Sequence, residues 1–369
     1  MTFFAPKKCH VCAIIFLSMA LLLPANGFAQ EQTADSDQTA KNVILLIGDG
    51  MGLTQMSSIY FQDVETVHFD QFTNIGLIKT WSADAKITDS ASSATAYAAG
   101  IKTFNGALGV NVDSVSVTSI VERISPNGIA TGLLATSSIT HATPAAFYAH
   151  VPSRGMHETI AKHLAESEVD FFAGGGLQFF ASREDGQDYY NILGEHGFVV
   201  DSTKLAMKSE IDASKKYGFL LAADGMPPIL NGRGPFLPDA TELALDYFSK
   251  KGAPFFMMVE GSQIDWGGHG NNARYLTTEV EDFNEVLGKA LAFAESDGNT
   301  LVVVTADHET GGFALSSGDN YNSLNGTFST GGHTATLVPV YAFGPGASRF
   351  NGIYQNTAIY DKILEATGW

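Results

Sequence analysis

The chain has 369 residues, 45% of them hydrophobic, and a formal net charge of −18 at pH 7. The hydrophobic content is ample for a large core. The acidic balance argues against nucleic acid as a general partner, because binding a phosphate backbone requires a basic surface. An anionic substrate would need a local cluster of cations or arginine to overcome the overall field.

The first 29 residues have the pattern of a secretory signal peptide. Two lysines precede an apolar run at 13–23, and small residues flank Phe28 before a cleavage site after Ala29. The apolar run is too short to span a bilayer, and no later stretch reaches spanning length. Both cysteines, Cys9 and Cys12, lie inside this segment. We therefore expect an exported protein, periplasmic or secreted, with neither a membrane span nor a disulfide after cleavage.

Residues 30–41 are polar and lack an apolar period, which is typical of a flexible leader. From residue 42 to 369 the sequence predicts a single α/β domain. Buried strands are expected where short apolar runs recur, at 43–48, 129–137, 169–175, 255–261, 301–307 and 338–344. Helical patterns lie between them, at 156–166, 240–250 and 277–295. This alternation favours a three-layer sandwich, with a largely parallel central sheet and helices on both faces.

Polar side chains recur where the predicted strands end. Asp49 follows the first strand in the segment IGDGMG, Glu260 closes the strand FFMMVEG, and Asp307 follows LVVVTA. Thr143 comes a few residues after the strand at 129–137. Ligand crevices in open α/β sheets form at this edge. A plain turn or half of a dinucleotide fingerprint also fits IGDGMG, but the third glycine of the fingerprint is missing, so we favour a metal ligand at Asp49.

Ser90 lies in TDSASSATA, at the predicted start of a helix of small residues. Free amides and the helix dipole favour anions there, and a serine hydroxyl activated by a metal ion could act as a nucleophile. The simpler interpretation is a helix cap formed by Asp89 or Ser90. This segment alone does not decide between them.

The remaining candidates could each have a structural role when taken singly. Asp265 and His269 are four residues apart and would share one face of a helix. Asp307 and His308 are neighbours at a strand end, and His333 lies in a loop flanked by glycine. Arg154 could clamp two phosphate oxygens with its planar fork of donors, or make only a surface salt bridge.

Taken in order, the segments IGDGMG, TDSASSATA, HATPAAFYAHVPSR, VEGSQIDWGGH, TADHETGG and STGGH resemble the alkaline phosphatase family, specifically its compact bacterial members. The resemblance implies two zinc ions, one held by Asp265, His269 and His333, the other by Asp307, His308 and Asp49. It implies one magnesium ion held by Asp49, Thr143 and Glu260. Ser90 would be the metal-bound nucleophile that becomes phosphorylated, and Arg154 the phosphate clamp.

The chain differs from some family members at two positions near the substrate. His141 and Trp266 stand where some members have an acid and a lysine, so the third site could favour zinc or cobalt, and phosphate should bind more weakly. Residues 309–332 form a minimal crown segment, and the family implies a homodimer. Small phosphate monoesters are the expected substrates. A phosphodiesterase of the same superfamily and a non-catalytic phosphate- or metal-binding protein are the alternatives.

Overall fold

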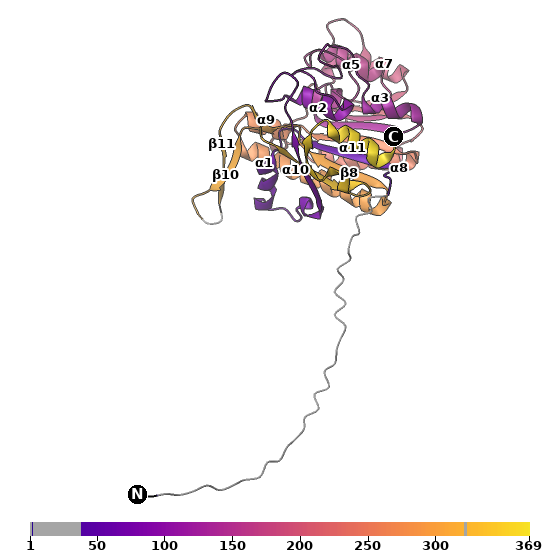
Figure 1. The fold of residues 1–369 in the computed structure, drawn as a ribbon. Helices are drawn as coiled ribbons and strands as arrows, with labels where there is room; N and C mark the ends of the chain where they lie inside the picture. Colours follow the sequence, from indigo (N-terminus) through magenta and orange to yellow (C-terminus); the bar gives the residue numbers. More distant parts are fainter. Residues whose placement is uncertain (1, 3–37, 321–322) are drawn as a thin grey trace, which may run out of the picture. The chain divides into compact units, whose positions relative to one another are not determined.

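The computed structural model describes residue 2, residues 38–320 and residues 323–369 (Figure 1). The predicted signal peptide, residue 2 apart, and most of the predicted leader lie outside these residues. Ala40 already belongs to the folded unit, because its side chain is buried and its amide donates to the Ala366 carbonyl at 2.9 Å. Among the described residues, no helix is long and apolar enough to cross a membrane.

The core of the fold is a ten-stranded sheet in the order β14-β2-β13-β8-β1-β7-β3-β4-β6-β5. The six strands predicted from the apolar runs are all confirmed, and they lie next to one another in the middle of the sheet. They are β1 (Asn42–Gly48), β3 (Ala130–Ser138), β4 (Phe171–Gly175), β7 (Phe255–Gly261), β8 (Thr300–Thr305) and β13 (Val338–Phe343). Shorter strands complete the two ends: β2 (Asn74–Lys79), β5 (Phe198–Asp201), β6 (Lys216–Leu220) and β14 (Gly352–Gln355).

Most neighbouring strands of this sheet are parallel, as predicted. The exception is β13, which runs antiparallel to both β8 and β2. The strand β1 lies between β7 and β8 and is parallel to both. The carboxyl ends of these three buried strands therefore meet at one edge of the sheet.

Helices cover both faces of the sheet (Figure 1). On one face α8 (Phe236–Lys251) and α10 (Ala273–Asp297) pack against each other and against the central strands. On the other, α2 (Ser90–Ala99) packs against α4 (Ala142–Ala145) and α11 (Ala358–Thr367). The remaining α-helices are α1 (Leu53–Ser57), α3 (Ile120–Ile124), α5 (His157–Ala165), α6 (Gln178–Ala181), α7 (Tyr189–Glu195) and α9 (Gln263–His269). The three helices expected from sequence correspond to α5, α8 and α10.

The chain after β8 forms two small antiparallel sheets over the expected crown segment. Strand β9 (Glu309–Thr310) pairs with β12 (His333–Thr334), and His333 lies opposite Thr310 in this pairing. Strands β10 (Phe313–Ser317) and β11 (Leu324–Phe328) form a hairpin that projects at the left of Figure 1. The β9–β12 pairing returns His333 to the end of β8.

Candidate functional site

Three carboxylates from neighbouring strands meet at the sheet edge. Asp49 directly follows β1, Glu260 is opposite Ile47 near the end of β7, and Asp307 lies two residues beyond β8. All three side chains are fully buried. Burial of several acids at one place is unfavourable unless cations neutralise them, so this arrangement points to bound metal.

The turn after β1 requires glycine and also presents a carboxylate. Gly50 has φ +72°, and a Cβ there would lie 2.8 Å from the Cα of Asp265. The Gly50 amide donates to Oδ1 of Asp307 at 3.0 Å. The turn and metal-ligand interpretations of IGDGMG are therefore compatible, because the tight turn brings Asp49 close to Asp307 and α9.

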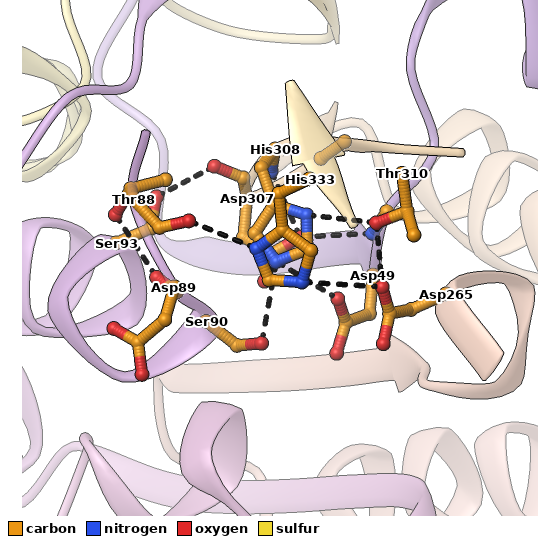
Figure 2. Close-up of polar contacts among 12 residues, drawn as sticks. Asp49, Thr88, Asp89, Ser90, Ser93, Asp265, Asp307, His308, Thr310 and His333 are labelled. Atoms are coloured by element: carbon orange, nitrogen blue, oxygen red, sulfur yellow. Dashed lines mark hydrogen bonds and ion pairs between the residues drawn. The ribbon is translucent and has the colours of Figure 1, made fainter. Parts of the chain in front are cut away.

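Ser90 is the first residue of α2, and Asp89 caps that helix by accepting a hydrogen bond from the Ser92 amide at 3.0 Å. Small buried residues let α2 pack closely, and two hydroxyls fasten it to the end of β8. Ser93 donates to the Asp307 carbonyl at 2.8 Å, and Tyr97 donates to the Ala306 carbonyl at 2.6 Å. As a result, the Ser90 hydroxyl lies 3.3 Å from Nε2 of His308. Figure 2 draws Ser90 and His308 among the polar contacts of the site.

Among the described residues, three groups of side chains have the geometry of metal sites, with ligand atoms within 4.8 Å of one another in each group. The first is Asp265, His269 and His333, the second Asp49, Asp307 and His308, and the third Asp49, His141 and Glu260. The His308 and His333 rings stack with centroids 3.5 Å apart, so the first two groups are adjacent. Asp49 belongs to both the second and the third.

The first group comes from α9 and β12. Helix α9 places Asp265 and His269 on one face, with Nε2 of His269 3.4 Å from Oδ1 of Asp265. Nε2 of His333 lies 3.6 Å from the same oxygen and 3.1 Å from Nε2 of His269. The helical spacing predicted from sequence is thus observed, and His333, which was expected in a loop, joins the group from strand β12.

The second group surrounds Nε2 of His308. This nitrogen lies 3.1 Å from Oδ2 of Asp307 and 3.4 Å from Oδ1 of Asp49. Burial, and then the charges of nearby acids including Asp307, raise the pKa of Asp49 well above its ordinary value. For Asp307, burial acts to raise the pKa, but the positive charge of His308 holds it below its ordinary range.

The third group has mostly oxygen ligands. Oε2 of Glu260 accepts hydrogen bonds from Ser262 at 2.6 Å and Ser137 at 3.2 Å, and burial raises the pKa of Glu260 to about 7. Thr143, in α4, lies close to Glu260 and is fully buried. His141 precedes α4, and the structure places it among possible ligands of this group as well as beside the candidate clamp.

Arg154 is held in place by Asp89 and His141. Its Nη1 donates to Oδ2 of Asp89 at 3.0 Å, and its Nη2 lies 3.1 Å from Nε2 of His141. Burial, together with the charge of Arg154, lowers the pKa of His141 to about 3, so this imidazole is neutral at pH 7. Trp266 meets the His141 ring edge-on, with centroids 6.1 Å apart.

Sequence reasoning missed Thr310, whose hydroxyl joins the first two groups. It donates to Oδ1 of Asp265 at 2.5 Å and lies 3.1 Å from Nδ1 of His308 (Figure 2). The spacing of Thr310 from His308 offered a signal, because residues two apart on an extended chain face the same side. Ser137 and Ser262 were also missed, and no local pattern distinguishes them from other buried serines.

Comparisons with known proteins agree with this geometry. A family model described as alkaline phosphatase matches residues 40–327. Alkaline phosphatase 3 of Bacillus subtilis is 33% identical, and the match covers 98% of this chain and 97% of that protein. The structure of alkaline phosphatase from the Antarctic bacterium TAB5 is similar with a TM-score of 0.88 and 56% identity, covering 90% of this chain and 99% of that one.

A variant of the TAB5 enzyme, with one histidine replaced by aspartate and Mg bound in its M3 site, matches with the same TM-score and 54% identity over 90% of this chain and 99% of that one. The family match over most of the chain, the shared fold and the candidate metal-binding groups point to one assignment. The chain belongs to the alkaline phosphatase family.

Proposed function

We propose that this enzyme hydrolyses phosphate monoesters through a phosphoserine formed at Ser90. The observation that carries this proposal is the position of the Ser90 hydroxyl, at the start of a helix and 3.3 Å from a histidine of a metal-binding group. A serine hydroxyl is a weak nucleophile by itself and needs such a neighbour. Small-molecule phosphate monoesters are the proposed substrates, with broad tolerance of the leaving group.

The donor atoms fit bound divalent ions. Both carboxylate oxygens of Asp49 are buried without a hydrogen-bond partner among the described residues, as are Oδ2 of Asp307 and Oε1 of Glu260. The same holds for Oγ1 of Thr143 and Nδ1 of His141. Buried polar atoms are normally paired, so these unpaired acceptors fit the cation sites of the proposal.

We assign the ions by ligand chemistry. The imidazole-containing groups, Asp265 with His269 and His333, and Asp49 with Asp307 and His308, suit zinc. Asp49, Thr143 and Glu260 offer oxygen ligands of the kind magnesium prefers, and His141 could shift this third site towards zinc or cobalt. When bound, these ions supply positive charge that lowers the pKa of the Ser90 hydroxyl and stabilises charge on the reacting oxygens.

The side chains of the protein position the reactants. The guanidinium of Arg154 binds two nonbridging phosphoryl oxygens, and Asp89 and His141 fix its orientation. The oxygen of Ser90 attacks phosphorus as its proton passes to solvent, the bond between phosphorus and the ester oxygen breaks, and the alcohol departs with a proton from solvent. Water then attacks the phosphoserine, which restores the Ser90 hydroxyl and releases inorganic phosphate. The positive end of the α2 helix dipole, at Ser90, favours the anionic phosphoryl group throughout.

We also propose an exported homodimer. The proposal of export, to the periplasm or the medium, follows from the signal-like pattern of residues 1–29. The proposal of a dimer comes from the family alone. The acidic net charge of −18 supports solubility and argues against a nucleic-acid partner.

The test is to measure phosphate release from an aryl phosphate by the intact protein and by a Ser90→Ala variant, with and without chelator. Acid quenching during turnover should trap phosphate on Ser90 of the wild type and none on the variant. Chelator should abolish activity, and added zinc and magnesium should restore it. Activity that is insensitive to chelator would refute metal-dependent catalysis. No turnover with metal bound would leave a non-catalytic binding protein as the better description.

A further inference from the structure

The segment at residues 221–235, between β6 and α8, packs beside the site. Its inner part is fixed by Gln263, a fully buried residue of α9. The side-chain amide of Gln263 donates to the carbonyl of Met226 at 2.7 Å and to that of Thr136 at 3.0 Å. The Met226 amide in turn donates to the Thr136 carbonyl at 3.0 Å. This part of the segment therefore cannot move independently of α9 and β3.

The outer part of the same segment is fixed by Arg233. Its guanidinium is fully buried and donates to Glu279 at 2.6 Å and to Asp282 at 2.8 Å, both in α10. The Ile229 amide donates to Glu279 at 2.9 Å. A buried arginine paired with two carboxylates holds a defined geometry, because its planar donors are directional.

Directly before Met226, Gly225 packs against the indole of Trp266. A Cβ at Gly225 would lie 2.5 Å from Cη2 and 3.1 Å from Cζ3 of Trp266. The Trp266 ring then meets His141, and Nε2 of His141 lies 3.1 Å from Nη2 of Arg154. A continuous set of contacts thus runs from Gly225 to the candidate phosphate clamp.

We propose that Gly225 is a positioning residue for phosphate binding, because its missing side chain lets Trp266 lie where it orients His141 and Arg154. The inference rests on the proposed role of Arg154. Ordinary carbon contacts are no closer than about 3.5 Å, so alanine at this position would displace the indole by about 1 Å. The backbone of Gly225 is outside the left-handed region, so alanine adds no backbone strain.

The main test is a double-mutant cycle on the metal-loaded enzyme. Gly225→Ala should raise the inhibition constant of inorganic phosphate and the KM about 2- to 10-fold, the range expected for one lost aromatic contact, with a smaller change in kcat. In a Trp266→Ala background the same substitution should change neither constant, because the ring it displaces is absent. Gly194→Ala is the matched control, since a Cβ there meets nothing within 4 Å.

Tryptophan fluorescence gives a readout that does not depend on catalysis. The chain has three tryptophans, so a Trp81→Phe/Trp369→Phe background leaves Trp266 as the only emitter. Gly225→Ala should shift its emission, and Gly194→Ala should not. If Gly225→Ala destabilises the fold, Trp266→Phe should restore the melting temperature by making room.

The proposal fails if Gly225→Ala leaves both emission and phosphate inhibition unchanged, or if its effect persists undiminished without the Trp266 indole. Failure of the proposed function would look different. In that case Ser90→Ala would keep full activity. The fluorescence shift of Gly225→Ala, and the absence of its effect in the Trp266→Ala background, would still be observed.

Discussion

Replacing Thr310 by valine should weaken metal binding, because its hydroxyl contacts both Asp265 and His308. Valine has nearly the same shape as threonine and removes only the hydroxyl. Thr310 is fully buried, so water cannot easily take the place of the lost group. The substitution therefore leaves Oδ1 of Asp265 without this donor and Nδ1 of His308 without its partner.

The magnitude follows from the bond to Asp265. A hydrogen bond to a charged group contributes about 1.5–3 kcal/mol. Partners that orient metal ligands typically change metal affinity about 10- to 100-fold, which corresponds to roughly 1.4–2.7 kcal/mol. We expect a loss of zinc affinity in that range, with kcat falling when zinc is limiting.

The assay is competition for zinc between the protein and a fluorescent chelator, which yields a dissociation constant without any measurement of turnover. Thr310→Ser keeps a hydroxyl and should retain most of the affinity. Thr327→Val is a second control, because that hydroxyl donates to the Ala314 carbonyl in the β10–β11 hairpin. A Thr310→Val protein that binds zinc as tightly as the wild type would refute the reasoning.

Three further outcomes are expected. Metal-free protein should lose stability as the pH rises from about 4.5 to about 7, because burial raises the folded-state pKa of Glu260 to about 7. Ionisation of this carboxyl then favours the unfolded chain by roughly 3 kcal/mol. Chemical unfolding at several pH values should show a weaker dependence of the unfolding free energy on pH for Glu260→Gln. Trp266→Lys should tighten inhibition by phosphate, since it adds a positive charge beside His141; unchanged or weaker inhibition contradicts this. Asp89→Ala should raise KM for the ester about tenfold through loss of the bond to Arg154, and Asp89→Asn should recover part of the loss.

The sequence was sufficient to predict the middle of the sheet. Runs such as 43–48 and 301–307 are apolar without alternation, and strands buried on both faces have this composition. The edge strands β5 and β14 were missed because they are only four residues long and partly exposed, so their apolar runs are too short to indicate a buried strand. The direction of β13 could not be predicted either, since a buried apolar run has the same composition whether its neighbours are parallel or antiparallel.

For the site, the sequence by itself determined the list of candidate residues, because acids, histidines and one serine follow strand ends or begin a helix, and local propensity sets those positions. The family resemblance supplied an expected grouping of the ligands, but only the tertiary structure decided that His141 joins the third group, that Thr310 contacts two groups, and that Gly225 meets Trp266. These contacts connect residues far apart in the chain, and their geometry depends on how the strands are ordered in the sheet and how the loops pack across its edge, which no local pattern encodes.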